Sequence, residues 1–169
     1  LEQEGLLQKA GGRGYRVRDV DEGEVKDAVE VRGTLEGLAA RLLAERGVTP
    51  GVRVRLMECL DQGDAIFEKG VINEQDMEEY NGINVLFHHT ILEACGNKAI
   101  SFAIQRNDHL PFASIRSVAV DLDALDREYT RFHLAHLQHR IIFDALDNGQ
   151  SARAEAIMRE HAYAAVQYI

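Results

Sequence analysis

The chain has 169 residues, enough for one domain with a hydrophobic core of its own. Its 19 lysines and arginines are outnumbered by 28 aspartates and glutamates, and a net charge of -9 repels phosphate backbones, so this fragment is not expected to bind nucleic acid by itself. Two cysteines without a CxxC pair, no secretory leader pattern and no long apolar run predict a cytoplasmic protein that does not enter a membrane.

Residues 1–20 differ in character from the rest of the chain. A short apolar helix end runs into the glycine-rich residues 11–14, and the "YRVR" that follows alternates as a short strand does. The segment is also locally basic. We interpret it as the end of a preceding module, with a second unit spanning residues 21–169.

The second unit is predicted to be helical almost throughout. Caps and breakers delimit the segments: Thr49 precedes Pro50, Asn73 and Asn97 precede apolar runs, Ser151 follows a "DNGQ" turn, and Gly47, Gly70 and Gly96 end helices. The expected helices are residues 21–46, 50–70, 73–95, 97–108, 122–147 and 151–169. Six helices with short connections predict an all-α antiparallel bundle.

Three of these helices each place one histidine on an apolar face. The three are His88, His139 and His161, and Asn84 lies one turn before His88. Imidazole nitrogens bind zinc, nickel, copper or iron, and an amide oxygen is a weaker companion. The pattern predicts a divalent metal, zinc or another transition metal such as nickel, with open coordination positions. The alternative is that these are hydrogen-bonded core histidines without a metal.

Three more residues are candidates for contacting a bound ligand. Arg32 falls among the apolar residues of the first helix, so it either pairs with an internal acid or binds an anionic ligand. His136 lies one turn before His139 and projects toward the same apolar face, where it either contacts a ligand or packs against neighbouring side chains. Arg116, in the irregular stretch after Pro111, is a further candidate for the anion, with a surface charge as its alternative.

No catalytic set emerges from the sequence. The chain has no GxSxG, HExxH or P-loop pattern, and Cys59 and Cys95 lack the basic context of a nucleophile, so we predict buried structural thiols and no enzyme activity. A metal-dependent hydrolase remains the alternative. Its general base would be His136, since no inward acid is expected beside it. The other histidines, His89, His109 and His133, are interpreted as solvated.

Several segments together resemble one known family. "VEVRGTLEGLAARLLAERG", "NVLFHHTILEACGN" and "HRIIFDALDNGQSARAEAIMREH" resemble the first helix, the Phe-His segment and the closing two-histidine segment of the FCD domain. This all-helical domain binds effectors in GntR-superfamily transcription regulators of the FadR-type branch. The leading "EGLLQKAGGRGYRVRD" is similar to the end of the family's winged helix-turn-helix, including its wing. The resemblance covers essentially the whole chain.

The resemblance implies a function and a set of site residues. It maps metal ligands onto Asn84, His88, His139 and His161, where Asn84 replaces a usual aspartate and brings no negative charge. It also implies a small organic acid whose carboxylate binds the metal, assisted by an arginine of the first helix that Arg32 matches. "HLPFASIRSVAV" with "AHLQHR" is similar to members that respond to aromatic acids such as vanillate.

The expected molecule is therefore the sensor of a homodimeric regulator. Its operator DNA would be bound through the missing N-terminal domain, and effector binding would shift the two DNA-binding domains relative to each other. A coupling on the order of 1 to 3 kcal/mol would suffice to change operator affinity appreciably.

Overall fold

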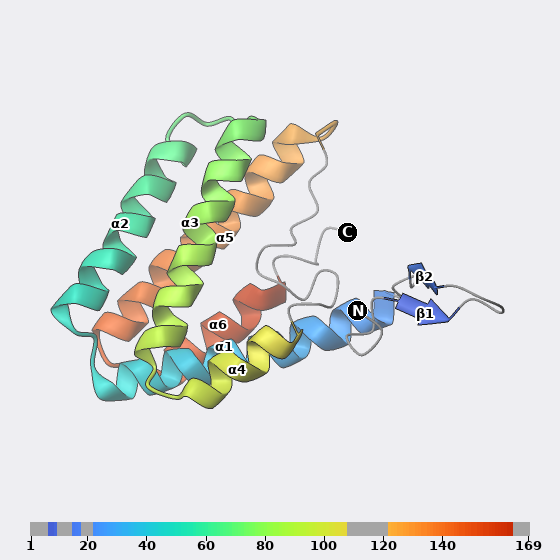
Figure 1. The fold of residues 1–169 in the computed structure, drawn as a ribbon. Helices are drawn as coiled ribbons and strands as arrows, with labels where there is room; N and C mark the ends of the chain where they lie inside the picture. The colour runs from blue at the N-terminus through green and yellow to red at the C-terminus, as the bar shows by residue number, and fades with distance from the viewer. Residues whose placement is uncertain (1–6, 10–14, 18–21, 108–121, 164–169) are drawn as a thin grey trace.

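The computed structural model describes residues 7–9, 15–17, 22–107 and 122–163 (Figure 1). Within these ranges, six helices follow a two-stranded hairpin. The elements are β1 (Leu7–Lys9), β2 (Tyr15–Val17), α1 (Glu22–Arg46), α2 (Pro50–Phe67), α3 (Glu74–Ala94), α4 (Lys98–Asn107), α5 (Leu125–Asp147) and α6 (Ser151–Tyr163). The predicted all-α bundle of six helices is confirmed, and none of the described helices is long and apolar enough to cross a membrane.

The hairpin pairs β1 with β2 in antiparallel register, Leu7 opposite Val17 and Lys9 opposite Tyr15. The strand expected in "YRVR" is present. The helix end expected before the glycine-rich turn does not reach residues 7–9, which form the partner strand instead. An isolated helical turn is marginal in water, whereas pairing with the adjacent strand satisfies the same backbone groups.

The helix ends follow local chemistry. Thr49 caps α2 by accepting a hydrogen bond from the backbone nitrogen of Val52 at 3.5 Å, and Asn73 forms a capping box with Asp76 at the start of α3. Gly96 after α3 has a φ of 73°, a conformation that favours glycine. Ser151, expected as a cap, is instead the first residue of α6.

Helix α2 packs against both α3 and α5, while α6 and α4 lie along α1 (Figure 1). Glycines permit the close approach of α1 to α6. A Cβ atom added at Gly33 would lie 2.9 Å from the Cβ of Ala162, and one added at Gly37 would lie 2.6 Å from Cγ of Arg159. This close packing carries His161 on α6 toward the interior residues of α1.

The buried face of α1 is rotated relative to the sequence prediction. The sequence predicts one buried face made of Val25, Ala28, Val29, Arg32, Leu35, Ala39 and Leu42. Ala28, Val29, Arg32 and Ala39 are buried as predicted, whereas Val25, Leu35 and Leu42 are only half-buried. The buried face also includes small residues and one acid, Gly33, Glu36, Gly37 and Ala40. Small side chains bury little apolar surface themselves, so a hydrophobic pattern underweights them, although they allow helices to pack closely.

Candidate metal centre

Three histidines from three helices meet in the interior of the bundle. His88 lies on α3, His139 on α5 and His161 on α6, and all three side chains are buried. The Nε2 atoms lie 2.9 Å apart between His139 and His161, 3.2 Å between His88 and His161, and 3.4 Å between His88 and His139. We call these residues the histidine triad. The structure brings together the three histidines that the sequence singled out.

The spacing of the triad fits a metal ion. At a zinc–imidazole distance of about 2.0–2.1 Å, bound nitrogens lie about 2.9 Å apart at right angles and about 3.4 Å apart at tetrahedral angles. The three observed separations, 2.9, 3.2 and 3.4 Å, fall in this range. Each residue offers one nitrogen to the same point, as a tripod of ligands does.

The outward Nδ1 atom of each triad imidazole faces a different polar group. Nδ1 of His161 lies 2.9 Å from Oε1 of Gln138, and Nδ1 of His139 lies 3.5 Å from the hydroxyl of Tyr80. Nδ1 of His88 lies 3.2 Å from Oε1 of Glu36 on α1. Such outer partners fix the orientation and tautomer of metal-binding histidines.

These outer partners determine which atoms carry protons. The Oε1 atom of Gln138 and the carboxylate of Glu36 are acceptors only, so they favour a proton on Nδ1 of His161, which contacts Gln138 at 2.9 Å, and on Nδ1 of His88, which faces Glu36 without an aligned hydrogen bond. When neutral, both therefore present a lone pair at Nε2 toward the centre of the triad. At least two of the three converging nitrogens are then acceptors, and a cation satisfies all three at once.

Burial keeps His139 and His161 ready to bind a cation. Burial lowers the pKa of His161 to about 3, with His88 and Arg32 acting in the same direction and Glu36 against it. Burial likewise places the pKa of His139 well below its usual value, and the neighbouring histidines add to the effect. These imidazoles are neutral near pH 7, which is the form that binds a metal.

Glu36 is the site residue that sequence reasoning missed. Its side chain is 1 % exposed, and although an internal acid was left open as a partner of Arg32, no acid was assigned to the three histidines. Burial by itself would raise its pKa, but His88, Arg32 and His161 together lower that pKa to about 2. The usable signal was its position four residues after Arg32, the spacing at which opposite charges on one helix meet.

Arg32 is buried beside this acid. Its Nε atom lies 3.8 Å from Oε2 of Glu36, and its Nη2 atom donates to the backbone oxygen of Ala162 at 3.2 Å. Of the two roles open for Arg32 at the sequence level, pairing with an internal acid is thus present in the structure. Its contact with an anionic ligand stays a prediction.

Asn84 and Arg116 were also predicted to belong to the site. Asn84 is half-buried on α3, one turn before His88, and its role as a metal ligand stays a prediction. Arg116 lies outside the described residues, as does His109.

His136 is buried on α5 but does not join the triad. Its Nε2 atom lies 2.8 Å from Oδ1 of Asp64 on α2, and the same carboxylate binds Arg140 through two nitrogens. Burial, aided by His133, lowers the pKa of His136 to about 4. We call this group the Asp64 cluster. Contact between His136 and a ligand stays a prediction.

The remaining histidines and the cysteines are structural or exposed. His89 is exposed as expected, but the prediction for His133 was wrong, because its ring is half-buried and stacks on Phe67 with centroids 5.1 Å apart. Cys59 and Cys95 are buried free thiols, as predicted. Burial raises the pKa of Cys59 to about 11, so its thiol is protonated and unreactive near pH 7.

Comparison with known families matches residues 27–164 to the FCD domain. The HTH-type transcriptional repressor GlaR of Escherichia coli is 24% identical over 173 residues, covering 95% of this chain and 71% of the repressor. A probable D-xylose utilization operon transcriptional repressor of Paenarthrobacter nicotinovorans is 27% identical over 157 residues, covering 93% of this chain and 63% of the repressor.

Solved structures show the same fold. McbR/YncC of E. coli superimposes with a TM-score of 0.65 at 20% identity, covering 95% of this chain and 71% of that chain. GntR of Streptococcus agalactiae gives a TM-score of 0.58 at 16% identity, covering 96% and 75%. The relatives are thus transcription regulators, and this chain spans about two thirds of the curated ones.

Proposed function

The chain belongs to the FCD domain family, the effector-sensing domains of GntR-type transcription regulators, and on this premise we propose that it senses a small organic carboxylate at a buried divalent metal. The convergence of three imidazole nitrogens within 3.4 Å of one another carries the proposal. His88, His139 and His161 would hold the metal, with Asn84 as a weaker oxygen ligand. Zinc suits a site of imidazoles and an amide, and nickel is the second choice.

The metal supplies a Lewis-acidic centre to which a carboxylate binds. Three protein nitrogens leave coordination positions at which a carboxylate can bind, and its negative charge would help neutralise the metal ion. We propose that Arg32, buried in contact range of Glu36, helps hold the effector, with His136 and Arg116 as further contacts. Aromatic acids are the first class to test, because of the sequence resemblance around residues 109–120 and 135–140.

Operator DNA would be bound outside the helical bundle. We propose that residues 1–20, with the β1–β2 hairpin, are the remnant of a winged helix-turn-helix whose remainder reads the operator. A change at the metal would reach that domain through α1, which carries Arg32 and Glu36 and follows the hairpin in the chain. No enzymatic step is needed for this role, and the chain is proposed not to be an enzyme.

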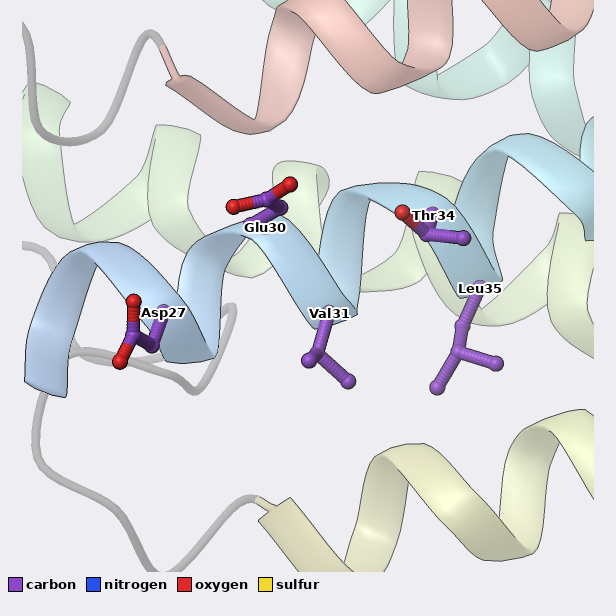
Figure 2. Close-up of a pocket in the computed structure, with 5 residues that line it drawn as sticks. All are labelled: Asp27, Glu30, Val31, Thr34 and Leu35. Carbon is purple, nitrogen blue, oxygen red and sulfur yellow. The ribbon is translucent and has the colours of Figure 1, made fainter.

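The regulator would act as a homodimer, through the outer face of α1. Val31 and Phe102 on α1 and α4 are 47% and 61% exposed, which leaves apolar surface for a partner. Val31 and Leu35 line a hollow of about 420 Å³ and point from α1 toward α4, with Asp27 and Glu30 at its edge (Figure 2). A second copy of the chain would cover this surface and hold two DNA-binding domains at a fixed spacing.

The test measures metal and effector together. Tag-free protein is analysed for bound metal, and its thermal unfolding is followed with and without chelator and with aliphatic and aromatic carboxylates. We expect the metal to raise the melting temperature and a carboxylate to raise it further only in metal-loaded protein. No bound metal and identical melts would refute the proposal in favour of a metal-free structural bundle.

A further inference from the structure

The outer partners of the histidine triad differ in charge. Gln138 and Tyr80 are neutral, whereas Glu36 brings a carboxylate to 3.2 Å from Nδ1 of His88. Its two oxygens and Nδ1 of His88 are fully buried, and none makes an aligned hydrogen bond to a described residue. A buried carboxylate without aligned donors is costly, so it needs positive charge nearby.

The proposed ligand set cannot supply negative charge itself. Three imidazoles and the amide of Asn84 are all neutral, and a divalent ion placed among them would bring two positive charges into the interior. Burying uncompensated charge is strongly unfavourable. Glu36, which also pairs with Arg32, is the carboxylate placed behind His88 to offset part of this charge, and it interacts electrostatically with His161.

We infer that Glu36 is the positioning residue of the metal centre: it fixes His88 with its proton on Nδ1 and supplies the negative charge that the ligands lack. This inference rests on the proposed metal site and adds to it a residue outside the ligand set. A carboxylate behind a histidine orients the ring and makes Nε2 a stronger donor to the metal. Arg32 in turn holds the carboxylate, with its Nε 3.8 Å from Oε2 of Glu36.

The direct test is the zinc affinity of Glu36→Gln, measured by competition with a chromophoric chelator. Glutamine keeps the shape and an acceptor atom but removes the charge. We expect affinity to fall roughly 10- to 100-fold, the usual effect of losing an outer partner. The matched control is Glu45→Gln on the same helix, whose side chain makes an exposed ion pair with Arg41 and should leave zinc affinity unchanged.

A second variant moves the carboxylate instead of deleting it. Gln138→Glu in the Glu36→Gln background places a carboxylate behind His161, whose Nδ1 faces that side chain at 2.9 Å. Recovered zinc affinity is expected, and a purely structural role for Glu36 would not give it. If Glu36→Gln does not fold, Gln138→Glu alone serves: tighter zinc binding supports the charge argument, and unchanged binding contradicts it.

The outcomes separate this inference from the proposed function. If Glu36→Gln binds zinc as tightly as the parent while His88→Ala does not bind, the metal site stands and the role of Glu36 is refuted. If the parent protein itself binds no zinc, the metal site fails and the inference fails with it.

Discussion

Two buried histidines three positions apart on α5 have opposite environments. His136 meets the Asp64 carboxylate at 2.8 Å, and Arg140 completes that group near the surface. His139 meets the Nε2 atoms of two other histidines at 2.9 and 3.4 Å. The inner nitrogen of His136 contacts a carboxylate that Arg140 already neutralises, whereas the inner nitrogen of His139 faces two other imidazole nitrogens. Burial alone therefore does not identify a candidate metal ligand. The group that faces the inward ring nitrogen distinguishes His139 from His136.

Removing one histidine from each group should give the largest difference between them. His139→Ala should abolish zinc binding, while His136→Ala should retain it. With zinc at 100 times its dissociation constant, binding contributes about 2.7 kcal/mol, or roughly a 5–10 °C rise in melting temperature. That zinc-dependent rise, measured by calorimetry, should vanish in the first variant and persist in the second. Equal loss in both would assign the Asp64 cluster to the metal centre.

Glycine substitutions test the packing beneath each group. A Cβ atom at position 63 would lie 2.2 Å from Cε1 of His136, so Gly63→Ala should destabilise the apo protein by roughly 1–3 kcal/mol and leave zinc affinity intact. Gly37→Ala presses α1 away from α6, which carries His161, and should lower both stability and zinc affinity. Denaturant titration and chelator competition measure the two effects. Weaker zinc binding in Gly63→Ala would show that the groups are coupled.

Acidification should destabilise the metal-free protein through both groups. The pKa values of His136 and His161 in the folded protein, about 4 and about 3, lie below the ordinary value of 6.5. Between the folded and the ordinary pKa values, the unfolded chain therefore binds more protons than the folded protein does. Their contribution is complete above pH 6.5 and declines as the pH falls toward the folded pKa values, by roughly 1 kcal/mol per histidine near pH 5.5. Denaturant unfolding between pH 7.5 and 5 measures this slope. A pH-independent free energy of unfolding would contradict it.

The smallest expected change concerns Asn84. Asn84→Asp adds a negative charge one turn before His88, so zinc affinity should rise by about tenfold if the amide is a ligand. Chelator competition measures the difference, and Asn81→Asp on the same helix is the control. Weaker zinc binding in Asn84→Asp would show that residue 84 is not part of the ligand set.

The fold could be predicted from sequence because its signals are local. Thr49, Asn73 and Gly96 mark helix ends whatever the tertiary structure. The described helix boundaries lie within a few residues of those predicted, and the predicted end of α6 at residue 169 lies outside the described residues. The hairpin strand at residues 7–9 was missed because three residues carry too little pattern to separate a strand from a helix end.

The site could be predicted only in part, for a related reason. A histidine on an apolar face stands out, so His88, His139 and His161 were found. Glu36 was not assigned to the site, because an acid and the small residues beside it, Gly33 and Gly37, add nothing to the apolar pattern that marks the buried face of α1. Which nitrogen of each ring faces inward depends on partners from other helices, and the spacing along a single helix does not contain that information.

X-ray absorption spectroscopy of the zinc-loaded protein tests most directly whether three imidazoles hold one metal ion. We predict three imidazole nitrogens at about 2.0–2.1 Å from zinc, completed by oxygen and free of sulfur. A zinc environment with sulfur ligands, or with fewer than three imidazoles, would show that the histidine triad does not hold the metal as proposed.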